Sequence, residues 1–468
     1  MEEIITKYRI MTSLENIKFK KSEFYTVGDY ILRIFFILLF SMLCFTLFRT
    51  TQDPLNSIIA STTAFFLIVV FSAFILLKSN KWIAFFIIAY FVKILIGLIH
   101  YLYFIDPEYF QTGAYKALTW EFEAVFERIL SYSHEKQSYG IFYFEYRKGD
   151  FEHQEILNLI SIPFVYFGDN VLTITPINAF SSLLISINVI LISKYKFHSS
   201  NKRLKYIAIT TAYFPMTLIS SLLYRDIVGL ALMSIGLVLV LLSKKSTTKY
   251  LMLIIACYLF YLQRTVYPVI LIVAFVIDYI FFQRTKRNAA ELFYKIVTVI
   301  VCLIAFLIIF KYSNTETNQE MASGAFSFNF LFLPVKLILG LVGPFPWNQF
   351  LMYEIMPAYA YQLEDYLQAT LNMSIVAVLI IYRKKYFNKK SFNLLNITGL
   401  LLILTGLFNT FMHMTYVGIG FVFLLPWLFS NIDIKKFTTI YIKVFLIIFI
   451  LNILVIAFFG NLGVKSLL

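Results

Sequence analysis

Two short charged stretches interrupt apolar runs in the middle of this chain. The segment SLLYRDIVGL places Arg225 and Asp226 in one run, and the segment YLFYLQRTVYPVIL places Gln263 and Arg264 in the next. A guanidinium group can hold a phosphate through two parallel hydrogen bonds, and a nearby carboxylate can accept the proton of an attacking hydroxyl. These residue types therefore suggest chemistry on a substrate that carries both a phosphate and a hydroxyl.

A second group of acidic side chains lies upstream. Ten Asp and Glu residues fall between Asp106 and Glu155, and one of these carboxylates could accept the proton of an incoming hydroxyl. Stabilising a leaving phosphate is mostly electrostatic work and is stronger where water is partly excluded. The structural alternative for Asp106 is an acid that ends a helix before a proline, which is a good turn sequence by itself.

The composition indicates where these side chains must work. The chain has 468 residues, of which 60% are hydrophobic and only 14% charged, so a single water-soluble core would leave most of the apolar surface exposed. A membrane-spanning helix needs about 20 apolar residues, and the sequence contains many such runs. We therefore predict an all-α, polytopic integral membrane protein, with a cytoplasmic segment at residues 1–28 and one transmembrane domain at 29–468.

The apolar runs predict about thirteen transmembrane helices. The run from residue 206 to residue 242 would be about 55 Å long as one helix, which suits two short crossings with Arg225 and Asp226 at the turn between them. The predicted spans are residues 31–48, 57–77, 83–105, 171–193, 206–224, 227–243, 250–263, 266–282, 291–311, 366–382, 393–412, 415–430 and 438–459.

Basic side chains fall in short clusters between these runs. The formal net charge of +14 could suggest nucleic acid, but clusters of this kind are typical of cytoplasmic loops, so we expect no nucleic-acid partner. Both arginine-bearing turns then lie at the extracytoplasmic end. A snorkelling residue that ends a helix would explain each arginine separately, whereas the two together favour a function. The clusters lie at residues 78–81, 194–205, 244–249, 284–287, 383–390 and 435–436.

Two extracytoplasmic elaborations are predicted. In the outer loop at 106–170, apolar residues recur every three or four positions from Ala114 to Leu130, which predicts an amphipathic helix on the membrane surface, and we place residues 156–168 at the interface. Residues 312–365 contain Pro344 and Pro346 and predict an interfacial or re-entrant hairpin. Three further candidates for contact with substrate are Lys336, Glu354 and His413.

Three motifs occur in a fixed order within roughly residues 100–290: DPEY at 106–109, YFGDNVLTITPINAF at 166–180 and YFPMTLISSLLYRD at 213–226. This order resembles the membrane glycosyltransferases of the GT-C superfamily and the related O-antigen and exopolysaccharide polymerases. The resemblance implies that Asp106, with Glu108, occupies the place of a catalytic acid that serves as base or metal ligand. It also implies that Arg225 and Arg264 bind a lipid-linked phosphate. The Asp-x-Glu motif departs from the commoner Asp-x-Asp or Glu-x-Asp, which puts metal dependence in doubt.

Two functions of different classes follow from these observations. The favoured one is a glycosyltransferase or polymerase that assembles cell-envelope polysaccharide from polyprenyl-phosphate or polyprenyl-pyrophosphate carriers, among membrane lipids and other assembly proteins. It would lie in the bacterial inner membrane with a cytoplasmic amino terminus, and a divalent cation is an optional cofactor. The alternative is a transporter or flippase for a lipid-linked or anionic solute, whose ionisable residues should lie near mid-membrane. Lys93 is the main residue there.

Overall fold

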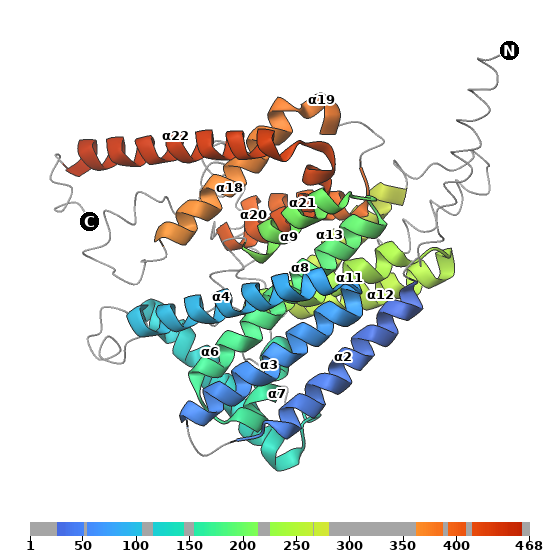
Figure 1. The fold of residues 1–468 in the computed structure, drawn as a ribbon, viewed down its shortest axis with the longest axis vertical. Coiled ribbons are helices and arrows are strands. Elements are labelled where there is room, and N and C mark those ends of the chain that lie inside the picture. Colours follow the sequence, from blue (N-terminus) through green and yellow to red (C-terminus); the bar gives the residue numbers. More distant parts are fainter. Residues whose placement is uncertain are drawn as a thin grey trace.

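The structure is a computed structural model that describes residues 26–50, 54–104, 116–144, 154–213, 225–264, 266–279, 362–386, 392–408 and 414–460. Within these ranges it is helical and contains no strand (Figure 1). The helices are α2 (Val27–Leu47), α3 (Pro54–Leu77), α4 (Asn80–Phe104), α6 (Lys116–Tyr139), α7 (Gln154–Phe167), η1 (Val171–Thr173), α8 (Ile174–Tyr195), α9 (Asn201–Ala212), α11 (Arg225–Leu242), α12 (Ser246–Gln263), α13 (Tyr267–Ile277), α18 (Gln362–Ile381), α19 (Arg383–Tyr386), α20 (Leu394–Phe408), α21 (Met414–Asn431) and α22 (Ile434–Gly460).

The described helices are those of a membrane protein. Four are long and apolar enough to cross a bilayer: Val27–Leu47, Leu55–Leu77, Asn80–Leu98 and Val171–Tyr195. Shorter apolar helices occupy most of the other predicted spans, so the all-helical membrane class is confirmed, while the total of about thirteen spans stays a prediction. The predicted span 291–311 lies outside the described residues, and of the predicted span 206–224 the structure describes only the part covered by α9 and Tyr213.

The helices of the first half alternate between two ends of the bundle. At one end, which we call the basic end, the positive charge of Lys78, after α3, lies close enough to repel that of Lys194 of α8. Lys196 and Lys249 of α12 repel each other in the same way. At the opposite end, which we call the α7 end, the backbone N–H of Thr50 donates to the Tyr166 carbonyl at 2.9 Å. The basic loops of this half that the structure describes thus gather at one end, as the predicted topology requires.

Helices α6 and α7 form a layer at the α7 end (Figure 1). The apolar side of α6 packs on α7, with Val125 and Ile129 buried and the rings of Phe126 and Phe164 5.9 Å apart. Most of α7 is itself buried, including Pro163 in its interior. The expectation of a helix here is confirmed from Lys116 onward, and the part of its apolar face whose side chains are described, from Val125 on, packs on α7. The pattern could not distinguish packing on α7 from contact with lipid, because both offer equally apolar surroundings.

Helix α8 is the core of the bundle, buried along almost its whole length between α3, α4, α9 and α11. Its polar side chains make bonds inside the protein. Asn188 accepts from the Tyr30 hydroxyl of α2 and donates to the Ser234 hydroxyl of α11, both at 2.8 Å. Helices α18 to α22 form the other part of the structure, and α22 extends along the top of Figure 1.

Candidate functional site

Helices α11 and α12 form an antiparallel hairpin that brings the two charged turns together. The Gln263 side chain donates from Nε2 to Oδ1 of Asp226 at 2.6 Å. Both side chains are buried, with exposed fractions of 8% for Asp226 and 1% for Gln263. The sequence predicted that these two turns lie at the same end of the bundle. It did not identify Gln263 as the partner of the carboxylate.

A glycine makes this contact sterically possible. A Cβ atom at Gly229, one turn after Asp226, would lie 1.4 Å from Oε1 of Gln263 and 3.0 Å from Ile156 of α7. The amide therefore occupies the space that any other residue at 229 would fill. Its Oε1 atom is buried and has no hydrogen-bond partner, so the amide is held by its bond to Asp226 and by close packing.

Two further charged residues lie at the same end of this hairpin as Asp226. Arg225 is the first residue of α11, and Asp226 lies in its first turn, where the helix dipole favours a negative charge. Arg264 caps the carboxyl end of α12 in an extended conformation, its backbone N–H donating to the Phe260 carbonyl at 3.1 Å, and its side chain is half-buried. Asp226 at the start of α11 and Arg264 at the end of α12 thus lie at the same end of the hairpin.

Helix α7 connects this hairpin to α6. Ile156 of α7 faces Gly229, while Asn158 accepts a hydrogen bond from Nζ of Lys136 on α6 at 2.6 Å. Lys136 is 1% exposed and lies 4.8 Å from the centre of the Phe144 ring. Burial lowers the pKa of the Lys136 amine from its ordinary 10.5 to about 8, and the adjacent Glu135 carboxylate opposes that shift.

The FGDN segment that contributed to the family resemblance has a structural role here. Gly168 follows α7 with a φ of 75°, a conformation that favours glycine. The Asn170 side chain accepts from the Leu172 backbone N–H at 2.9 Å and so caps η1. Asp169 lies 2.8 Å from Nε2 of His134 on α6. Sequence reasoning missed this last contact, because the two residues are 35 positions apart and neither has a distinctive spacing.

The other candidate residues are not brought into this site by the described structure. Asp106, Glu108, Lys336, Glu354 and His413 lie outside the described residues, and of Arg225 only the backbone is described. Within the part of the chain that is described, no group of three or more His, Cys, Asp and Glu side chains could hold a metal ion.

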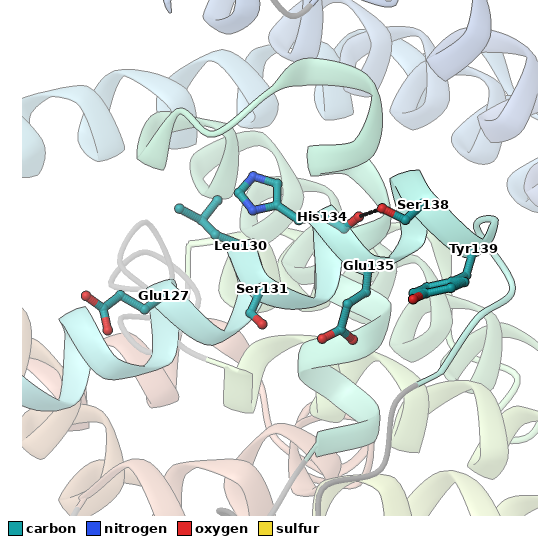
Figure 2. Close-up of a pocket in the computed structure, with 7 residues that line it drawn as sticks. All are labelled: Glu127, Leu130, Ser131, His134, Glu135, Ser138 and Tyr139. Carbon is teal, nitrogen blue, oxygen red and sulfur yellow. Dashed lines mark hydrogen bonds between the residues drawn. The ribbon is translucent and has the colours of Figure 1, made fainter.

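An open, shallow depression runs along α6 and is lined by side chains of this helix alone (Figure 2). Its volume is about 500 Å³, and side chains of α6 from Glu127 to Tyr139 line it.

Comparison with known proteins gives no relative: no family model, no curated protein and no solved structure matches this chain.

Proposed function

We propose that this protein is a membrane glycosyltransferase or polymerase that assembles cell-envelope polysaccharide from polyprenyl-linked sugars at the outer face of a bacterial inner membrane. In this proposal the amino terminus is cytoplasmic, so the α7 end faces outward. Arg264 and Arg225 hold the lipid-linked phosphate, and Asp226 contributes to substrate contact. Asp106 and Glu108 supply the catalytic acid, as the family resemblance implies.

The observation that carries the proposal is the buried bond between Gln263 and Asp226 beside Arg264. A buried carboxylate and amide are costly to desolvate, and helices can be joined in a membrane by apolar packing alone. A polar contact whose geometry also requires glycine at 229 is therefore better explained by function than by folding. An arginine at the end of a span meets a phosphate head group where water is partly excluded, which strengthens the interaction.

The transporter alternative is supported by a different observation. Lys93 of α4 is 3% exposed and lies within the long apolar helix Asn80–Leu98. Ionisable side chains inside a span commonly mark a route for ions or substrates. In the described residues the buried bond between Asp226 and Gln263 is at a bundle end, which favours the transferase, because a transporter needs its substrate site near the middle.

Replacing Arg264 tests the phosphate grip. We expect Arg264→Ala to lower the rate of long-chain glycan formation about 100- to 1,000-fold with unchanged protein in the membrane, measured by gel analysis of the glycan and by immunoblotting. Arg264→Lys should retain part of the activity, since lysine keeps the charge but not the bidentate fork. Arg203→Ala, at the exposed start of α9, is the matched control. Normal glycan in Arg264→Ala would reject the grip.

The same strain separates the two functions. If the protein is a transferase, lipid-linked sugars should accumulate on the outer face of Arg264→Ala cells, where membrane-impermeant periodate can oxidise them in spheroplasts. If it is a flippase, these sugars should stay protected on the cytoplasmic face. Protection from periodate in the variant would therefore favour the transporter.

A further inference from the structure

Lysine side chains from three parts of the chain come together at the basic end of the bundle. The charge of Lys194, near the end of α8, is repelled by Lys78 after α3. The charge of Lys249 on α12 is repelled by Lys196, which caps α8. Basic loops orient a membrane protein by being basic, which does not require lysines of different helices to lie close together. Because the repulsion opposes folding, stability does not explain why these lysines converge.

Carboxylates at this end offset only part of the positive charge. Asp278 attracts Lys249 and Asp29 attracts Lys78, but Asp29 already caps α2, and Asp278 is only 8% exposed. Helices α9 and α12 both begin here without an acidic residue in the first turn, where the helix dipole favours one. The first turn of α9 instead contains the basic pair at 202–203. The described groups at the basic end thus leave an excess of positive charge.

The loop between α8 and α9 places hydrogen-bond donors beside these lysines. The Ser199 backbone N–H donates to the Ser193 carbonyl at 3.1 Å, which folds the loop back onto the end of α8. The Ser199 hydroxyl is buried, with 9% of the residue exposed, and has no hydrogen-bond partner in the described structure. Ser200, the N-cap of α9, forms no side-chain capping bond. A hydroxyl and the N–H groups at a helix start are donors that suit a phosphate.

Two loops at this end also contain unfavourable backbone conformations. Among the non-glycine residues that the structure describes, Lys78 and His198 have a positive φ, of 52° and 48°. The left-handed region is unfavourable for a residue with a Cβ atom, and residues held there cluster at ligand sites. His198 directly precedes Ser199, so this conformation occurs in the same loop as the buried hydroxyl.

We propose that the basic end of the bundle binds a phosphoryl group, carried either by the head group of an anionic phospholipid or by a soluble phosphorylated molecule. Lys194, Lys196 and Lys249 supply positive charge. The Ser199 hydroxyl and the N–H groups at the start of α9 donate hydrogen bonds to the phosphate oxygens. The bound phosphate relieves the repulsion between the lysines. This site lies at the opposite end of the bundle from Arg264 and does not rest on the proposed function.

Thermal unfolding of the purified full-length protein in neutral detergent tests the site. The probes are inorganic phosphate, phosphatidylglycerol, and zwitterionic phosphatidylcholine with the same acyl chains, and sodium chloride of matched ionic strength controls for screening. We expect the midpoint to rise with phosphatidylglycerol or inorganic phosphate and not with phosphatidylcholine or chloride. A rise with phosphatidylglycerol alone identifies a lipid head group, and a rise with inorganic phosphate identifies a soluble phosphate. No rise with either, or an equal rise with chloride, would overturn the proposal.

Replacing Lys196 distinguishes a binding site from a merely structural cluster. Without a probe, Lys196→Ala should be at least as stable as the parent, because the repulsion on Lys249 is relieved. With the active probe, its apparent Kd should rise about tenfold, since a hydrogen bond to a charged group is lost, while Lys196→Arg should bind like the parent. Lys81→Ala removes the same charge from an exposed position at the basic end and is the matched control. Parental affinity in Lys196→Ala, or an equal loss in Lys81→Ala, would overturn the proposal.

Discussion

The hairpins α11–α12 and α20–α21 both use glycine for close backbone approach, with Gly236 against Ala256 in the first, but only the first also has a glycine that leaves space for a polar side chain. In the second hairpin Gly399 and Gly420 face each other, and a Cβ at Gly420 would lie 2.5 Å from the Gly399 carbonyl oxygen. The glycines there allow two backbones to approach, as small residues do between membrane helices. In the first hairpin Gly229 leaves space for the side chain of Gln263, which extends to Asp226.

The polar side chains of the two hairpins differ in the same way. In α20 the Thr398 hydroxyl donates to the Leu394 carbonyl of its own helix at 2.7 Å, and Asn396 accepts from the Asn393 N–H at the helix start. These bonds serve local structure. In the first hairpin the bond joins two helices, because Gln263 of α12 holds the Asp226 carboxylate of α11. Gly399 and Gly420 thus let two backbones approach, whereas Gly229 accommodates a buried polar side chain that contacts a carboxylate.

The largest expected effect is on folding, at the second hairpin. In Gly420→Ala the new methyl would meet the Gly399 carbonyl and the Ile403 backbone nitrogen, neither of which can move aside alone. We expect a loss of about 3 kcal/mol in the free energy of unfolding, measured by thermal unfolding in detergent. Gly28→Ala is the matched control, because its Cβ would have only one neighbour, at 3.9 Å, and alanine favours helix. Equal stability of the two variants would contradict the assignment of α20–α21 as a packing hairpin.

The next effect is on activity, at the first hairpin. In Gly229→Ala the new methyl displaces the end of a flexible side chain, so the helices can stay in place while Asp226 loses its donor. We expect about tenfold or greater loss of glycan formation, since one hydrogen bond to a charged group is worth about 1.5 to 3 kcal/mol, with a smaller stability loss than in Gly420→Ala.

A second substitution separates steric strain from the lost bond. In the double variant Gly229→Ala with Gln263→Ala, the new methyl no longer meets the Gln263 side chain, but Asp226 still lacks its hydrogen-bond donor. The stability should therefore match that of Gln263→Ala, and the activity should stay low. The substitutions should be strongly non-additive, because both act on one contact. Parental activity in Gly229→Ala would show that the position of Gln263 does not matter for function.

The lengths of the apolar runs predicted much of this fold, because a bilayer imposes a minimum length on each spanning helix. The predicted span 57–77 corresponds to α3 at Pro54–Leu77, and 227–243 corresponds to α11 at Arg225–Leu242. The alternation of basic loops also placed the two charged turns at one end, since each crossing reverses direction. These predictions needed only apolar length and charge position.

Partners across helices could not be predicted in the same way. The carboxylate of Asp226 pairs with Gln263, His134 with Asp169 and Lys136 with Asn158, and each pair depends on how helices rotate against each other. An apolar stripe fixes that rotation only roughly, because it spans more than 100° of the helix. Gly229 offered one usable sequence signal for the contact with Gln263, because it lies three residues after the charged turn. Glycine is, however, also common in membrane helices for packing alone.

The smallest effect concerns Lys136, which holds α6 against α7 one layer away from the first hairpin. Its folded pKa of about 8 lies below the ordinary 10.5, so between these values the unfolded chain binds more protons and stability rises with pH. Lys136→Met should remove this rise, measured as thermal midpoints in detergent from pH 7.5 to pH 10, with Lys81→Met, an exposed lysine at the basic end, as reference. The bond to Asn158 survives deprotonation, because a neutral amine still donates. Parallel pH profiles for the parent and Lys136→Met would show that the amine is not buried in solution, and α6 would then be less firmly attached to α7 than the bond to Asn158 implies.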